Sequence, residues 1–197
     1  VGRNGAGKTT LTKILAGDGQ PDHGRVERVG EIGYLPQDVR LYQGSLRENL
    51  TLGLPSPGDS QILRAAAMTG LDRVIKNHPK GLELEISEGG RGLSGGQRQL
   101  VGLTRMLLQQ PRILLLDEPT ASMDSQLEAR VMQHLFEEIP KSSALVVVTH
   151  KPALLTHIQR LIVIDQGRIV LDGPRDQVLA RLRNSQPPTP ANASSPP

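Results

Sequence analysis

The sequence predicts an α/β fold built on a mainly parallel sheet, and three observations lead to this class. Residues 113–116 and 144–148 are apolar runs with the length of buried strands, and Pro111 and Pro119 bound the first of them. Between the two runs, apolar residues recur at helical spacing over 127–135. Strands that alternate with helices in this way are typical of a parallel sheet.

The other elements are predicted from apolar spacing, caps and turn residues. Apolar residues between 11 and 15 indicate a helix that Gly17 can end, and short strands are expected at 25–29 and 31–35. The remaining elements are a short helix capped by Ser45, a helix from its cap at Asp59 through Met68, a helix from its cap at Ser94 to Gln109, a hairpin of 161–164 and 168–171, and a last helix over 176–182.

Composition limits the class of protein. The chain has 197 residues, of which 37% are hydrophobic and 2% aromatic, so we expect one domain with an aliphatic core. The net charge is +3 and the basic residues form no run, so we expect no nucleic-acid partner. There is no cysteine, which excludes disulfides and thiolate metal sites. No apolar run approaches the ~20 residues that span a bilayer.

The two ends of the chain differ from its middle. Val1 stands directly before a glycine-rich motif, and we interpret this as a truncated start with the N-terminal strands missing. From Ser185 onward, no apolar side chain is larger than alanine and proline and serine abound, so disorder is expected there. The sequence thus predicts one domain over 1–183 and a Pro/Ser-rich tail over 184–197.

Residues 2–9, Gly-Arg-Asn-Gly-Ala-Gly-Lys-Thr, fit the phosphate-binding pattern G-x-x-x-x-G-K-[ST]. Its glycines let backbone N–H groups turn toward phosphate oxygens, Lys8 would reach the β- and γ-phosphates, and the Thr9 hydroxyl would ligate Mg²⁺. The helix that begins here points its positive end at the anion. The residues predicted to bind the nucleotide are Gly2, Asn4, Gly5, Ala6, Gly7, Lys8, Thr9 and Thr10.

The apolar run 113–116 ends in two carboxylates, Asp117 and Glu118. A buried strand would deliver Asp117 to the metal side of the phosphates, and Glu118 would then polarise the attacking water as a general base. Alone, such a pair could be a solvated strand end. Together with the phosphate-binding loop, it predicts a P-loop NTPase.

The segment Leu-Ser-Gly-Gly-Gln at 93–97 resembles the signature sequence of ABC ATPases, and the family's remaining motifs follow in order over residues 1 to about 183. The resemblance implies ATP and Mg²⁺ as cofactors and a helical subdomain that carries the signature. It implies that Ser94, Gly95, Gly96 and Gln97 meet the γ-phosphate bound by an opposite subunit, that Gln37 senses Mg²⁺ and the attacking water, that His150 contacts the γ-phosphate, and that Asp124 couples two sites across a dimer. The expected metal-binding residues are Thr9, Gln37 and Asp117, and the expected catalytic residues are Glu118 and His150.

Two further segments resemble exporters. Residues 33–50 follow an exporter pattern, and residues 78–82 with 86–94 are similar to type I secretion ATPases, which export unfolded proteins. This resemblance implies a location at the cytoplasmic face of a bacterial inner membrane. The implied partners are a second ATP-binding domain, expected to form a homodimer with this one, a transmembrane domain of the same transporter, a periplasmic adaptor and an outer-membrane channel.

The resemblance is not complete, and two alternatives stay open. Residues 87–91 read Ser-Glu-Gly-Gly-Arg where exporters usually have G-E-R-G, and a short stretch before Tyr34 predicts a trimmed antiparallel β part. That shortness is shared with soluble ABC-F factors acting on ribosomes, although these typically have N-H-L-D where this chain has Ala-Ser-Met-Asp at 121–124. The third possibility is a regulatory module without hydrolysis, against which Glu118 and His150 argue.

Overall fold

The computed structural model describes residues 1–184, which divide into two compact units. The larger unit is Lys8–His150, and the smaller one joins Val1–Gly7 to the residues from Lys151 onward. The disorder predicted from Ser185 lies outside the described residues. Within them, no helix is long and apolar enough to cross a membrane.

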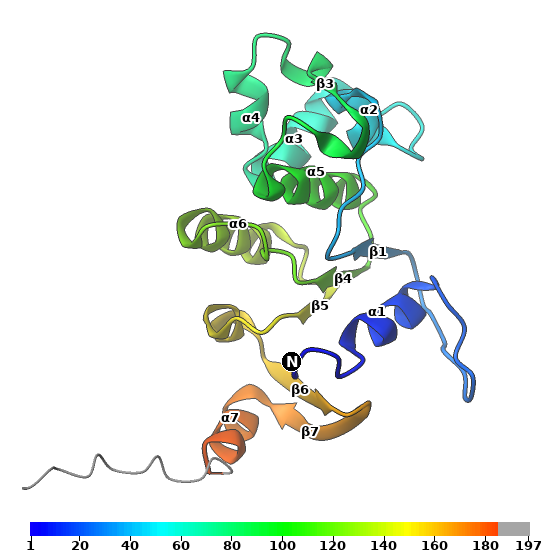
Figure 1. Cartoon of the computed structure of the whole chain (residues 1–197), viewed down its shortest axis with the longest axis vertical. Helices are drawn as coiled ribbons and strands as arrows, with labels where there is room; N and C mark the ends of the chain where they lie inside the picture. Colours follow the sequence, from blue (N-terminus) through cyan, green and yellow to red (C-terminus); the bar gives the residue numbers. More distant parts are fainter. Residues whose placement is uncertain (185–197) are drawn as a thin grey trace, which may run out of the picture. The chain divides into compact units, whose positions relative to one another are not determined.

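A parallel sheet in the order β1-β4-β5 forms the centre of the larger unit (Figure 1). Its strands are β1 (Ile32–Leu35), β4 (Ile113–Asp117) and β5 (Ala144–Val148). The register pairs Leu35 with Leu116 and Asp117 with Val148, so all three strands end at one edge. That edge is where parallel α/β sheets bind ligands.

Helices cover the sheet and form a group of their own. The helices of this unit are α1 (Lys8–Ala16), α2 (Leu46–Thr51), α3 (Asp59–Thr69), α4 (Asp72–Asn77), α5 (Gly95–Leu108) and α6 (Ser125–Glu138). Figure 1 shows α2, α3, α4 and α5 gathered on one side of the sheet. Two short strands, β2 (Gly44–Ser45) and β3 (Glu85–Ile86), pair antiparallel within this group, which also holds the 3₁₀ turns η1 (Gly81–Glu83) and η2 (Glu88–Gly90).

The core of this unit is aliphatic, as the composition predicts. Helix α5 approaches β1 so closely that a Cβ added at Gly102 would lie 2.9 Å from the Leu35 side chain. Fully buried side chains come from the helical group and from the central strand, and they include Leu46, Leu50, Ile62, Leu71, Leu103, Leu114 and Leu116.

The smaller unit is built on an antiparallel hairpin, β6 (Arg160–Asp165) and β7 (Arg168–Pro174), with α7 (Arg175–Asn184) and the 3₁₀ helix η3 (Pro152–His157). The hairpin turn has positive φ at Gln166 (46°) and Gly167 (73°), as a tight two-residue turn requires. Val1 pairs with β6, because its amino group donates to the Ile162 carbonyl at 2.8 Å. Leu161, Val163 and Val178 form the core of this unit.

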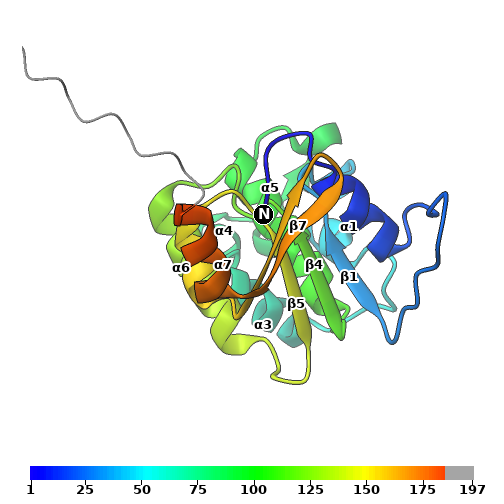
Figure 2. The ribbon, with the colours of Figure 1, turned by 90° about the horizontal axis from the view of Figure 1, so that it is seen from below.

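The α/β class with a parallel sheet is confirmed, and the predicted strands at 113–116 and 144–148, the hairpin and the last helix are all present. Figure 2 shows the three parallel strands from another side. The short strand predicted over 31–35 is present as β1. The helix expected from Ser94 to Gln109 is α5, with these residues as its two caps.

Three local predictions are wrong. No strand forms at 25–29, since Val29 is 80% exposed and Arg28 turns back to donate to the Ile14 and Leu15 carbonyls at the end of α1. The cap of α3 is Gly58, because the Asp59 side chain binds Arg47 instead.

The third error concerns burial. Strand β5 is buried only at Val148, because it pairs with β4 on one side only among the described strands of this unit. The helix predicted from the apolar residues between 11 and 15 is present as α1, in which Thr12 is buried and Leu11 is 40% exposed.

Candidate functional site

The residues that follow the three parallel strands gather at the carboxyl edge of the sheet. Gln37 follows β1, Glu118 follows β4, and His150 follows β5. The His150 Nδ1 lies 2.9 Å from Glu118 Oε1, a hydrogen bond in which the ring N–H donates to the carboxylate. The Glu118 side chain is 11% exposed and that of His150 62%. Two residues that the sequence predicts separately are therefore in contact.

The backbone of Glu118 is held in an unusual conformation. Its φ is 48°, in the left-handed region that a glutamate rarely adopts and that costs about 1–3 kcal/mol. The Glu118 N–H donates to the Val148 carbonyl at 2.9 Å, and the Ala121 N–H donates to the Glu118 carbonyl at 3.1 Å. The Gln99 Nε2 also donates to the Glu118 carbonyl at 3.2 Å. These bonds fix the residue against its own preference.

Gln99 was not among the residues predicted from the sequence. It lies on α5 on the same buried face as Gly96 and Leu103, each of which is about one helical turn away. A polar residue inside a buried helical stripe is the signal that could have identified it, since buried polar groups need hydrogen-bond partners.

Asp117 is fully buried, and neither of its carboxylate oxygens has a hydrogen-bond partner among the described residues. An unpaired buried carboxylate is costly unless a cation accompanies it. Burial raises the pKa of Tyr34, and the negative charge of Asp117 raises it further. No cluster of three or more His, Cys, Asp or Glu side chains that could hold a metal occurs in residues 1–184. Asp117 therefore fits a metal whose other ligands come from hydroxyl, water and phosphate oxygens, as Mg²⁺ prefers.

The glycine-rich loop has the backbone conformation that its glycines predict. Gly5 and Gly7 have φ of 79° and 92°, and the Ala6 N–H donates to the Arg3 carbonyl at 3.2 Å. Helix α1 begins at Lys8, directly after the loop, and Thr9 and Thr10 on its first turn are exposed.

The predicted signature segment begins α5. The Gln97 N–H donates to Ser94 Oγ at 3.2 Å, and the Ser94 N–H donates to Gln97 Oε1 at 2.8 Å, a reciprocal cap. Gly95 and Gly96 pack against the loop after Glu118, where a Cβ at Gly95 would lie 2.8 Å from Ser122 Cβ. These glycines are thus required for close packing of α5 on this loop.

Asp124 caps the next helix. Its carboxylate accepts from the Gln126 and Leu127 N–H groups, both at 2.9 Å, and the bond from Leu127 holds the pKa of Asp124 below its usual range. The contact across a dimer that the resemblance implies for Asp124 stays a prediction.

Comparison with known proteins identifies the family. The model of the family described as ABC transporter matches residues 1–121. The chain belongs to the ABC transporter family.

Solved and curated relatives agree with this assignment. The structure of a bacterial Atm1-family ABC exporter with ATP bound superposes with a TM-score of 0.85 and 26% identity over 91% of this chain and 34% of that one. The glutathione/L-cysteine transport system ATP-binding/permease protein CydC of Bacillus subtilis is 36% identical over 92% of this chain and 34% of its own length. The mycobactin import ATP-binding/permease protein IrtB of Mycolicibacterium thermoresistibile is 34% identical over 91% and 33%. The chain spans about a third of the length of these relatives.

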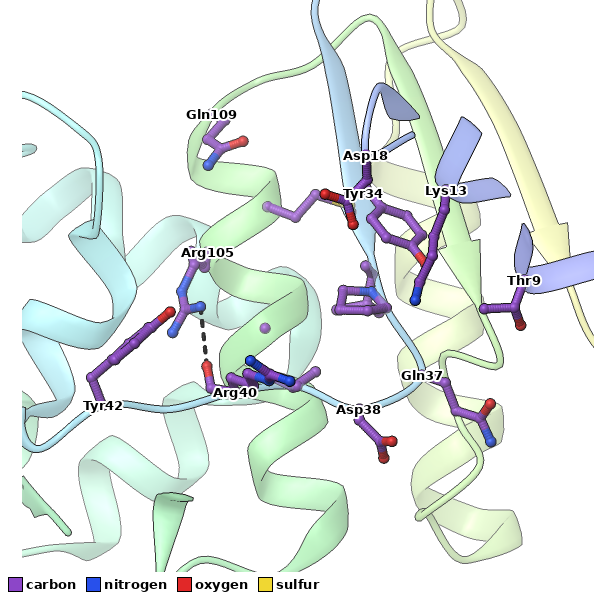
Figure 3. A pocket seen from close by; sticks show the side chains of 15 residues that line it. Thr9, Lys13, Asp18, Tyr34, Gln37, Asp38, Arg40, Tyr42, Arg105 and Gln109 are labelled. Atoms are coloured by element: carbon purple, nitrogen blue, oxygen red, sulfur yellow. Dashed lines mark hydrogen bonds between the residues drawn. The ribbon is translucent and has the colours of Figure 1, made fainter. Parts of the chain in front are cut away.

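This ABC domain also carries a pocket beside Gln37, with a volume of about 570 Å³ (Figure 3). Lys13 and Tyr34 line one side of it, and Arg40, Tyr42 and Arg105 line the other.

Arg105 ties this side of the pocket together. Its Nε donates to the Asn49 carbonyl at 2.6 Å and its Nη1 to the Arg40 carbonyl at 3.3 Å, as the dashed line in Figure 3 marks. Burial lowers the pKa of Arg105. The guanidinium thus holds both ends of the segment between Arg40 and Asn49 against α5.

Proposed function

We propose that this chain binds and hydrolyses ATP and that the hydrolysis powers export through an ABC transporter. The observation that carries the proposal is the hydrogen-bonded pair Glu118–His150 next to the unpaired carboxylate of Asp117. A buried carboxylate held by a histidine can take a proton from water, and an adjacent unpaired carboxylate can hold the cation that phosphates need.

Most of the predicted residues have a role in this proposal. The loop from Gly2 to Gly7 with Lys8 and Thr10 binds the phosphates. Thr9, Asp117 and Gln37 would hold Mg²⁺, which would neutralise charge on the phosphate oxygens. Glu118 accepts a proton from the attacking water, and His150 orients the Glu118 carboxylate. The helix start at Ser94 binds the phosphates of a nucleotide held by a second copy of the chain.

The test is Glu118→Gln in the full-length transporter that contains this chain. The amide cannot accept the proton, so the ATP hydrolysis rate should fall by at least about 100-fold. Binding of ATP should persist, because the phosphate contacts do not use Glu118. Hydrolysis is measured by phosphate release and binding by calorimetry. Glu138→Gln, an exposed carboxylate on α6, is the matched control. A wild-type rate in Glu118→Gln contradicts the proposed function.

The membrane partner is proposed to dock at the pocket beside Gln37. Residues of the segment from Gln37 to Tyr42 line the pocket, and Gln37 is the residue proposed to sense Mg²⁺. A helix of the transmembrane domain that fills this pocket would move with closure of the ATP site. Residues 86–92 are a second proposed contact, because they lie beside the β2–β3 pair that follows this segment.

The transported substrate is proposed to be an unfolded protein, as in type I secretion. The support is the similarity of residues 78–82 and 86–94 to that group. This version of the proposal adds a periplasmic adaptor, an outer-membrane channel and the cytoplasmic face of a bacterial inner membrane. Stimulation of the reconstituted transporter's ATPase by an unfolded polypeptide supports it, and stimulation by small hydrophobic compounds alone counts against it.

A further inference from the structure

Gln99 joins two segments that the proposed reaction uses. Its side chain is buried, with 3% of the residue exposed. The Nε2 donates to the Glu118 carbonyl at 3.2 Å, and the Oε1 accepts from the Ser122 N–H at 3.2 Å. One carboxamide therefore binds both ends of the loop from Glu118 to Ser122, and it reaches that loop from α5.

The loop that Gln99 binds is held in a conformation that it would not keep alone. Glu118 has a φ of 48°, and such a conformation persists only where the surroundings determine it. Inside the loop, the Ala121 N–H donates to the Glu118 carbonyl and the Met123 N–H donates to the Thr120 carbonyl, both at 3.1 Å. The bonds from Gln99 are side-chain contacts that anchor this turn to another element.

The first turn of α5 packs on the same loop without space between them. A Cβ at Gly95 would lie 2.8 Å from Ser122 Cβ, and one at Gly96 would lie 3.2 Å from the Ser122 carbonyl oxygen. Because packed protein interiors deform little, a shift of the α5 start is transmitted to Ser122. Gln99 extends this contact from Ser122 to the backbone of Glu118.

We propose that Gln99 is a positioning residue for ATP hydrolysis, which sets the Glu118 carboxylate in place according to the position of the helix that carries Ser94. This inference rests on the proposed function, since it assigns a partner to the base. Gln99 acts through the Glu118 backbone and does not touch the reacting atoms. Glu118 then reaches its working geometry only when α5 lies where the second nucleotide-binding chain would require it.

The experiment replaces Gln99 in the full-length transporter. Gln99→Met keeps the volume and removes both hydrogen bonds, whereas Gln99→Glu keeps the acceptor for Ser122 and removes the donor to Glu118. We expect kcat for ATP hydrolysis to fall by about 10- to 100-fold in both variants, with KM changed less than about threefold. A misplaced base slows the chemical step, whereas it leaves the binding of ATP unchanged. The matched control is Gln61→Met, an exposed glutamine that caps α3 through its side chain. Its kcat should stay at the wild-type value.

A double-mutant cycle separates positioning from a general loss of structure. If Gln99 acts through Glu118, then Gln99→Met should not lower further the residual rate of Glu118→Gln. An equal fold-loss in both backgrounds, or a wild-type kcat in both Gln99 variants, overturns the inference. Should only one Gln99 variant fold, as judged by its thermal melt, the kcat of that variant alone gives the same decision. A wild-type rate in Glu118→Gln itself would instead defeat the proposed function.

Discussion

At the scale of single residues, Asp117 combines complete burial with two carboxylate oxygens that have no hydrogen-bond partner among residues 1–184. A side chain in this state destabilises the metal-free protein, because the charge has lost its water and gained no donor. In the proposed function, the same property suits it to bind a cation. At this position the proposed metal binding requires a charged carboxylate, whereas the metal-free protein would be more stable with a neutral side chain.

The prediction for Asp117→Asn follows from this conflict. The neutral amide removes the buried charge, so the melting temperature in EDTA should rise by ~2–4 °C, which corresponds to about 1 kcal/mol in a chain of this size. Hydrolysis of ATP with Mg²⁺ should fall by about 100-fold or more. The exposed Asp22→Asn serves as control for both measurements. A melting temperature that does not rise would show that the carboxylate is compensated in solution.

Sequence reasoning at this scale named Glu118 and His150 from separate motifs, and the structure joins them in one hydrogen bond. It did not predict the left-handed φ of Glu118 or the bonds from Gln99. Both depend on how α5 lies against the loop after β4, and contacts between segments 19 residues apart in the chain follow from packing rather than from local propensity.

At the scale of elements, the strong sequence patterns predicted strands and helices that are present in the structure, and the weak patterns did not. The residues of β4 form a continuous apolar run bounded by prolines, a signal that only a buried strand satisfies here. The run at 25–29 has β-forming valines, yet none of the strands in residues 1–184 pairs with it, and strand propensity without a partner does not make a strand. The burial of β5 was likewise decided by its neighbours.

Two helix caps of the same design allow a matched test of the signature helix. The Ser45 and Ser94 hydroxyls each accept a hydrogen bond from the backbone N–H three residues further on. In return, the backbone N–H of each serine donates to the side chain of that residue, which is Glu48 for Ser45 and Gln97 for Ser94. Ser45→Ala and Ser94→Ala should each cost about 1 kcal/mol, a fall of ~2–4 °C in melting temperature.

Only Ser94→Ala should also reduce ATP hydrolysis, by about 10- to 100-fold, if its hydroxyl binds a phosphate oxygen. Phosphate release and thermal melts of the two variants decide between the roles. Equal rates in the two variants would mean that Ser94 is a cap and nothing more.

At the scale of the whole molecule, the α/β class was predictable because strands and helices alternate along the chain. The strand order was not predictable. Strand β1 lies beside β4, although the 77 residues from 36 to 112 separate the two strands in the sequence. That pairing depends on where the helical group between them folds. The division into two units was also unpredicted, because it separates Gly7 from Lys8 within one motif.

The last prediction concerns the assembly that a single copy of each motif requires. The phosphate-binding loop and the signature segment occur once each, so two complete sites need two chains related by a two-fold axis, each placing its signature opposite the other's loop. The chain contains no cysteine, so Arg3→Cys and Arg91→Cys, both at exposed positions, introduce single thiols beside the two motifs. Both are made in the Glu118→Gln background, where ATP should be retained.

Oxidation of a mixture of the two variants with ATP and Mg²⁺ should give a disulfide-linked dimer on a non-reducing gel. Either variant alone should give much less, because the two-fold axis places unlike motifs together and like motifs apart. Glu137→Cys on α6 in place of Arg91→Cys controls for random collisions. A dimer that forms equally without nucleotide, or equally with the control, would show that the two motifs do not meet around ATP, and the role of Ser94 in a shared site would have to be given up.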